Sequence, residues 1–257
     1  MSSSHSPHLT EEDESYFVSM TDLMVGMLFV FIIILMAFAL NFREAEQKQD
    51  QINQELTGAR EARQQMLQDI SHFLERRGVR VEIDSENGVL RLKADLLFER
   101  GQSHLSEQGE MIVAHVADAL WVVLPCYSNA GIKPQGCPSF KGGRLEAIFI
   151  EGHTDNDPFA KGALKNNWIL SAERAISTFK YLVAMQGGLE DIKNDESLHL
   201  LGVSGYAERR PTEKVEGQTE AAKKQADRRI DLRFIMASPK PEPLKATAKA
   251  IGEEQPQ

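Results

Sequence analysis

The feature that most constrains this chain is an uninterrupted apolar run near its N-terminus. From Leu23 to Leu40 every side chain is apolar or glycine. A helix of about 20 residues covers the roughly 30 Å hydrocarbon core of a bilayer, so the sequence predicts a single membrane-spanning helix over residues 17–42. The acidic leader, residues 1–16, lacks the basic start of a signal peptide, and we expect an uncleaved anchor.

Asp22 lies near the N-terminal end of this span, directly before the apolar run. A carboxylate near the hydrocarbon core costs about 2.5–3.5 kcal/mol on insertion scales, and such residues usually face a partner helix or a water path. Removal from water disfavours the charged form of a carboxyl group, which suits it to loading and releasing protons. Asp22 is therefore the candidate proton-carrying residue. The alternative is that it sits at the interface and caps the helix.

Charge and cysteines bear on partners and compartment. The 257 residues leave room for one medium domain, and the net charge of -9 excludes a nucleic-acid partner, because no basic face is available to neutralise phosphates. Arg43 and Lys48 follow the span, which by itself favours an outside N-terminus. Cys126 and Cys137 bracket a ten-residue loop that suits a disulfide in an oxidising compartment, with two free thiols as the alternative. We give the cysteines more weight and expect a cytoplasmic N-terminus and a periplasmic C-terminal part at a bacterial inner membrane.

A polar helical linker is predicted over residues 43–79. Its apolar residues step by three and four along one thin stripe, namely Ile52, Leu56, Ala59, Met66, Ile70 and Phe73. A thin stripe cannot bury itself in a monomer, so we expect it to pair with a second copy or to pack onto the soluble domain. A mobile helical linker is the alternative.

Residues 80–236 predict an α/β domain, and residues 237–257 a disordered tail. Ser106 is expected to cap one helix, and a second is expected from Ser171 to Gly187, with Ile176 and Phe179 facing the core. The element order β-α-β-α-β-β implies an α+β sandwich, a mixed sheet covered by helices on one face. The predicted strands are Val81–Ile83, Val89–Ala94, Leu145–Ile150, Leu198–Val203 and Ile230–Ile235.

Three motifs in this region resemble those of the OmpA-like peptidoglycan-binding domain. They are Glu151-Gly152-His153-Thr154-Asp155, Asn167-Trp168-Ile169-Leu170-Ser171-Ala172-Glu173-Arg174-Ala175, and Gly205-Tyr206-Ala207-Glu208-Arg209-Arg210-Pro211 followed by Asp227-Arg228-Arg229-Ile230-Asp231. The resemblance implies that the domain grips the free end of diaminopimelate in the peptidoglycan stem peptide. It assigns Asp155 and Arg174 as the ligand pair, with Asn167 and one of Arg228 or Arg229 nearby.

The chemistry of that pair can also be argued from the residues. Diaminopimelate ends in an ammonium beside a carboxylate, which calls for one fixed anion and one fixed guanidinium, whose planar fork binds a carboxylate bidentately. The alternative is an intramolecular Asp155–Arg174 salt bridge with no ligand. The chain departs from the family pattern at Asn156-Asp157-Pro158 and at Asp227, which stands where Asn often precedes the arginine pair.

Glu151, His153 and Asp155 alternate along one predicted strand, with Asp157 close by, and these are ligand types that zinc accepts. We expect no metal there, and His153 to be held by a backbone carbonyl instead. The sequence contains no Gly-rich phosphate loop, Gly-x-Ser-x-Gly elbow or His-Glu-x-x-His. We therefore expect neither a cofactor nor an enzyme.

The whole arrangement, a span with aspartate at its start, a helical linker and an OmpA-like domain, resembles MotB-type stator subunits. The segment Ser19-Met20-Thr21-Asp22-Leu23-Met24-Val25-Gly26-Met27-Leu28-Phe29 is similar to the ZorB subunits of the Zorya anti-phage defence system. That resemblance implies a homodimer inside a ring of a larger membrane partner similar to ZorA or MotA. The alternatives are a flagellar-type or Tol-like stator subunit and a passive cell-wall anchor.

Overall fold

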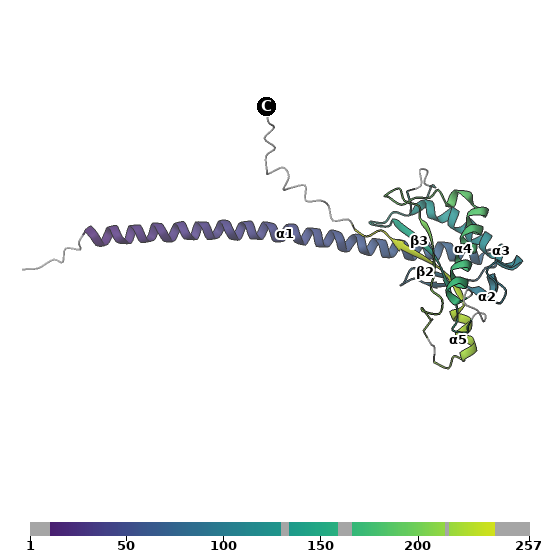
Figure 1. The fold of residues 1–257 in the computed structure, drawn as a ribbon. Coiled ribbons are helices and arrows are strands. Elements are labelled where there is room, and N and C mark those ends of the chain that lie inside the picture. The colour runs from purple at the N-terminus through teal and green to yellow at the C-terminus, as the bar shows by residue number, and fades with distance from the viewer. Residues whose placement is uncertain (1–10, 130–133, 159–165, 214–215, 240–257) are drawn as a thin grey trace, which may run out of the picture. The chain divides into compact units, whose positions relative to one another are not determined.

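The computed structural model describes residues 11–129, 134–158, 166–213 and 216–239, with side chains described from Met20 onward (Figure 1). The chain divides into two units, residues 1–53 and residues 54–257. Helix α1, Glu11–Glu75, begins in the first unit and ends in the second. It therefore starts within the predicted leader, whose residues 1–10 lie outside the described residues.

In the first unit, α1 carries the predicted span. Its side chains from Leu23 to Leu40 are exposed, as expected of a helix whose apolar surface faces lipid rather than a protein core. By length and composition, the part of α1 from Met20 onward is one of two described helices that could cross a membrane. The other is α3, Glu107–Val123, but its Val113, Val116 and Leu120 are buried in the core of the second unit.

The second unit is built on a five-stranded mixed sheet with strand order β1-β2-β5-β3-β4. Strands β3 and β4 are parallel and joined through helix α4, and the other neighbours are antiparallel. The α/β class and the mixed sheet predicted from the sequence are confirmed. The elements besides α1 and α3 are β1 Glu82–Asp84, β2 Val89–Lys93, α2 Ala94–Leu97, β3 Leu145–His153, α4 Asn167–Met185, β4 Leu201–Gly205, α5 Glu220–Asp227 and β5 Arg229–Met236.

The end of α1 forms part of the core of this unit. Ala62, Met66, Leu67, Ile70 and Leu74 are fully buried in one cluster with the inward side chains of the sheet and of α3 and α4. The thin stripe thus packs onto the domain, one of the two arrangements expected for it. The folded unit begins at Gln54, whereas the predicted domain began at residue 80, because the stripe alone does not reveal what covers it.

Two helices differ from the predictions. Helix α4 begins at Asn167, four residues before the predicted Ser171, because the Asn166 side chain caps it by accepting a hydrogen bond from the Ile169 N–H. Its buried face includes Arg174, while Ile176, expected to face the core, is exposed. Helix α5 was not predicted, since it is short and polar. By contrast, α3 begins as predicted, with the Ser106 hydroxyl accepting from the Gly109 N–H.

Candidate functional site

Asp155, Asn167, Arg174 and Arg228 lie together, and we call this group the β3–α4 site. Strands β3 and β5 are antiparallel with His153 opposite Arg229, so the residue before β5, Arg228, lies beside the chain that leaves β3 toward Asp155. Asn167 and Arg174 come from the first two turns of α4, which follows β3. The fold thus gathers the residues at one edge of the sheet.

The Asp155 carboxylate is buried and already has two partners. Its Oδ2 accepts a hydrogen bond from Arg228 Nη1 at 2.7 Å, and its Oδ1 accepts one from the Asp157 backbone N–H at 3.1 Å. A buried carboxylate with one guanidinium partner keeps acceptor capacity for a further cation. The contact with Arg228 is the ion pair that the structure gives Asp155; the alternative Asp155–Arg174 salt bridge is not formed.

Arg174 has an unusual environment for a buried guanidinium. Only 4% of the residue is exposed, and its guanidinium donates to backbone carbonyls, from Nε to Gln102 at 2.8 Å and from Nη2 to Glu99 at 3.4 Å. The guanidinium also lies over the Phe98 ring, 5.0 Å from its centroid. Among the described residues, no carboxylate forms an ion pair with it. Burial lowers the pKa of Arg174, and the Arg228 charge acts in the same direction, while the nearby charges of Asp95 and Asp155 partly oppose them.

Asn167 closes one side of the site. Its Nδ2 donates to the backbone carbonyls of Asp155, at 3.2 Å, and Asp157, at 3.1 Å, and lies 3.3 Å from Glu208 Oε2. Lys224 on α5 pairs with Asp157 at 2.6 Å. These contacts fix the backbone that follows β3, so they hold Asp155 in place rather than occupy its carboxylate.

The two candidate arginines, Arg228 and Arg229, lie in different places. Arg228 is in the site, and its Nε and Nη2 also donate to Asp95 on α2, each at 3.0 Å. Arg229 is buried on the outer face of the sheet, where its Nε donates to Asp231 at 2.9 Å. Asp95 was missed by the sequence analysis. The register that sets Lys93 opposite Arg229 brings it beside Arg228, and that register is not readable from the sequence.

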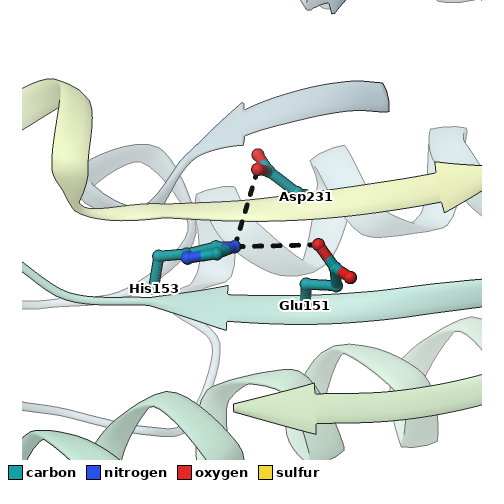
Figure 2. Close-up of side chains that lie close together, drawn as sticks. All are labelled: Glu151, His153 and Asp231. Carbon is teal, nitrogen blue, oxygen red and sulfur yellow. Dashed lines mark ion pairs between the residues drawn. The ribbon is translucent and has the colours of Figure 1, made fainter. Parts of the chain in front are cut away.

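The predicted metal-ligand residues take a different arrangement. Figure 2 shows Glu151 and His153 on β3 and Asp231 on β5 pointing toward one another, whereas Asp155 belongs to the β3–α4 site. His153 Nε2 lies 3.6 Å from Asp231 Oδ2 and 3.9 Å from Glu151 Oε2. Neither ring nitrogen of His153 has a hydrogen-bond partner among the described residues, so the expected backbone carbonyl is not there.

Arginines already occupy both carboxylates of this cluster. Arg233 donates to both oxygens of Glu151, at 2.9 and 2.8 Å, while Arg91 and Arg229 each donate to one oxygen of Asp231. A divalent ion would have to displace three guanidinium groups from a site in which all three candidate ligands are buried. The chemistry of the cluster therefore favours a charge network over a metal site.

A loop covers this network. The Tyr206 ring stacks on His153 with centroids 5.4 Å apart, and the Arg210 guanidinium lies 3.7 Å above the Tyr206 ring. Burial alone would raise the pKa of Glu151, but the adjacent His153 and the hydrogen bonds from Arg233 lower it to about 2. Burial and the Arg229 charge lower the pKa of His153. These shifts favour a Glu151 carboxylate beside a neutral His153 imidazole at neutral pH.

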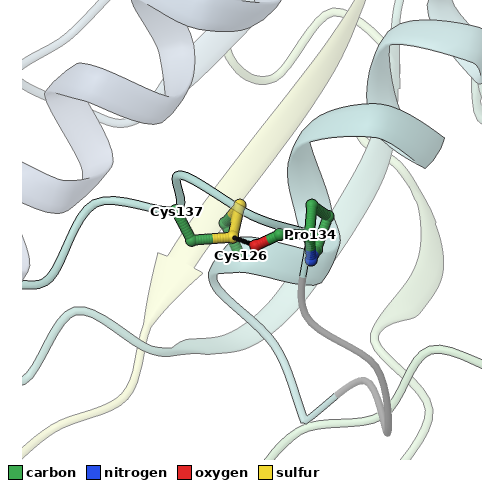
Figure 3. Close-up of a disulfide and its surroundings, with 3 residues drawn as sticks. All are labelled: Cys126, Pro134 and Cys137. Atoms are coloured by element: carbon green, nitrogen blue, oxygen red, sulfur yellow. Dashed lines mark hydrogen bonds between the residues drawn. A yellow bond between two sulfur atoms is a disulfide. The ribbon is translucent and has the colours of Figure 1, made fainter.

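Cys126 and Cys137 form a disulfide (Figure 3). The segment after the disulfide returns to α1 at Lys141, whose Nζ donates to Gln54 Oε1 at 2.6 Å. The bonded pair is the one expected from an oxidising compartment.

Asp22 belongs to the first unit. Its side chain is exposed on α1, and Gly26, one turn further on, has no neighbouring atom within 4 Å of the place a Cβ would take. This open glycine leaves room for another helix to approach near Asp22.

Comparisons with known proteins give likenesses of fold only. No protein-family model and no curated protein sequence matches the chain. Among solved structures, a MotB-like protein from Desulfovibrio vulgaris is similar at 19% identity and a TM-score of 0.48, over 70% of this chain and 97% of that one. The cell wall anchor of the type VI secretion system (T6SS) from Pseudomonas aeruginosa is similar at 18% and 0.44, over 65% and 96%. The periplasmic domain of MotB from Helicobacter pylori is similar at 19% and 0.39, over 58% and 75%.

Proposed function

We propose that the second unit binds peptidoglycan by gripping the zwitterionic end of diaminopimelate in the β3–α4 site. The observation that carries this proposal is Arg174, a buried guanidinium with backbone carbonyl partners but no carboxylate partner among the described residues. A ligand carboxylate would supply the missing anion, and Asp155 would take the ligand ammonium. The three sequence motifs that resemble the OmpA-like domain support the same ligand.

Substitution of either member of the pair tests this proposal. Asp155→Ala and Arg174→Ala should each reduce retention on purified sacculi at least tenfold, about 1.4 kcal/mol, because each removes one half of the clamp. Glu146→Ala, on β3 but outside the site, serves as the control. Thermal unfolding of each variant separates loss of binding from loss of fold. Full retention of both site variants on sacculi would reject the assignment.

The first unit extends the proposal to a motor. In this reading the chain spans the bacterial inner membrane once, with a cytoplasmic N-terminus, and works as a homodimer with a ring-forming membrane partner similar to MotA or ZorA. Asp22 carries the protons. Moving one charge through 150 mV releases roughly 3.5 kcal/mol, several times the thermal energy, and wall binding would hold one component still against the resulting torque.

The most specific part of the proposal is the biological process that the motor serves. The sequence around Asp22 and Gly26 is similar to that of ZorB subunits, and this supports a role in anti-phage defence over motility. The genes beside this one provide the test. A ZorA-like gene next to helicase or nuclease genes fits defence, while flagellar genes would replace that reading with motility. In either case no residue of the chain is proposed to catalyse a reaction.

A further inference from the structure

We propose that Asp95 is a positioning residue of the β3–α4 site, which limits the Arg228 guanidinium to a single hydrogen bond with Asp155 and so sets the preference of the site for a zwitterion. This inference rests on the proposed binding of diaminopimelate. It concerns a residue that neither the sequence motifs nor the chemistry of the ligand pair had singled out.

Two carboxylates share one guanidinium in the site. Arg228 donates from Nε and Nη2 to the two oxygens of Asp95, each at 3.0 Å, and only its Nη1 donates to Asp155, at 2.7 Å. The bidentate arrangement, in which a carboxylate accepts from two nitrogens of the fork, is the stronger one. Asp95 therefore holds the guanidinium, and Asp155 receives a single N–H from Arg228.

This division leaves Asp155 available to a ligand. Among the described residues, its Oδ1 accepts a hydrogen bond only from the Asp157 N–H, at 3.1 Å, and no second nitrogen of Arg228 donates to it. Without the Asp95 carboxylate, the fork of Arg228 would be free to turn and pair with both oxygens of Asp155. The ligand ammonium would then compete with a bidentate guanidinium for the Asp155 carboxylate.

The backbone keeps Asp95 in position. It lies in α2 directly after β2, and the Ala94 N–H donates to the Arg228 carbonyl at 3.0 Å, which ties the start of α2 to the residue that Asp95 holds. The Asp95 side chain is 40% exposed, so an amide of the same size can replace it without opening the core.

The test compares two ligands that differ only in their ammonium groups. Binding of meso-diaminopimelate and of pimelate, which has the same carbon chain and both carboxylates but no nitrogen, is measured by calorimetry on the full chain in detergent. Asp95→Asn should weaken meso-diaminopimelate about tenfold, the scale of one charged hydrogen-bonding interaction, and should not weaken pimelate. Asp195→Asn is the matched control, since Asp195 also accepts hydrogen bonds from two nitrogens of an arginine, Arg144, but on another part of the surface.

Each outcome has a separate meaning. Wild-type affinity for meso-diaminopimelate in Asp95→Asn, with the unfolding temperature unchanged, would overturn the role of Asp95. Equal weakening of both ligands would also overturn it, because a merely structural role predicts loss without a change in preference. Failure of the wild-type chain and of Asp195→Asn to bind meso-diaminopimelate would instead contradict the proposed function itself.

Discussion

His153 is an imidazole placed where it is costly to protonate. The ring is 1% exposed between β3 and the covering Tyr206, and the charged groups that face it are Glu151, Asp231 and Arg229. The two carboxylates favour its protonation, but burial and the arginine outweigh them, and the pKa of His153 is lowered. In the unfolded chain the same imidazole would titrate near pH 6.5.

A pH dependence of stability follows from this lowered pKa. As the pH falls through about 6.5, the unfolded state takes up a proton that the folded state refuses, so the free energy of unfolding falls by up to about 1.4 kcal/mol per pH unit. His153→Phe keeps a ring against Tyr206 but does not titrate, and should flatten the dependence between pH 7 and pH 5. Denaturant unfolding at each pH measures this.

His104→Gln provides the control for that experiment, because His104 is exposed and should leave the pH dependence unchanged. The carboxylate of Glu151 acts in the same direction but at lower pH. Its pKa of about 2 means that its contribution is present above about pH 4.5 and is lost toward pH 2. An unaltered slope in His153→Phe between pH 7 and pH 5 would show that His153 is not the titrating group.

At the scale of elements, the end of α1 meets the backbone of the segment after the disulfide. A Cβ on Gly58 would lie 2.1 Å from the Lys141 carbonyl oxygen, closer than any real contact, so the helix can approach this backbone only at a glycine. A Cβ on Gly142, whose φ is +68°, would lie 2.6 Å from the Glu55 carbonyl oxygen, which is also too close for a side chain. The Cys126–Cys137 disulfide closes the preceding loop and limits how far this contact can separate.

The variant Gly58→Ala tests whether close packing against Lys141 outweighs the higher helix propensity of alanine. Alanine favours a helix interior by about 1 kcal/mol over glycine, but overpacking against a backbone carbonyl costs typically about 1–3 kcal/mol. We expect a net loss of stability, seen as a lower unfolding temperature. Gly187→Ala is the control, since no atom lies within 4 Å of its Cβ position. A more stable Gly58→Ala variant would mean that the Lys141 backbone moves aside freely.

The same elements show what the sequence could predict. The strands and the Ser106 cap were found within a few residues, because alternation and capping are local patterns. The role of residues 54–75 as a core helix was left open, since a thin apolar stripe fits several partners. In the site, the motifs gave Asp155, Arg174 and Asn167, but Asp95 and the choice between Arg228 and Arg229 depend on strand register, which is set by long-range packing.

At the scale of the whole molecule, the two units carry different parts of the proposed function. The first has the Asp22 carboxylate directly before the apolar run of α1, and the second has a buried guanidinium without a carboxylate partner among the described residues. A passive wall anchor needs only the second feature. A proton-driven motor needs both, because force in the membrane is useful only against a fixed support. The two readings therefore differ at Asp22.

Asp22→Asn distinguishes them. The amide keeps the size and much of the hydrogen bonding of aspartate but cannot gain and lose a charge, so the variant should assemble with its membrane partner and bind sacculi, yet lose activity. Activity is measured as phage protection or rotation at matched membrane levels. Asp50→Asn, also on α1 in the first unit but beyond the apolar run, should remain active. Asp22 lies inside α1, which begins at Glu11, so it does not cap the helix as the alternative expected. Full activity in Asp22→Asn would leave a passive anchor, because an anchor needs no titrating group at that position.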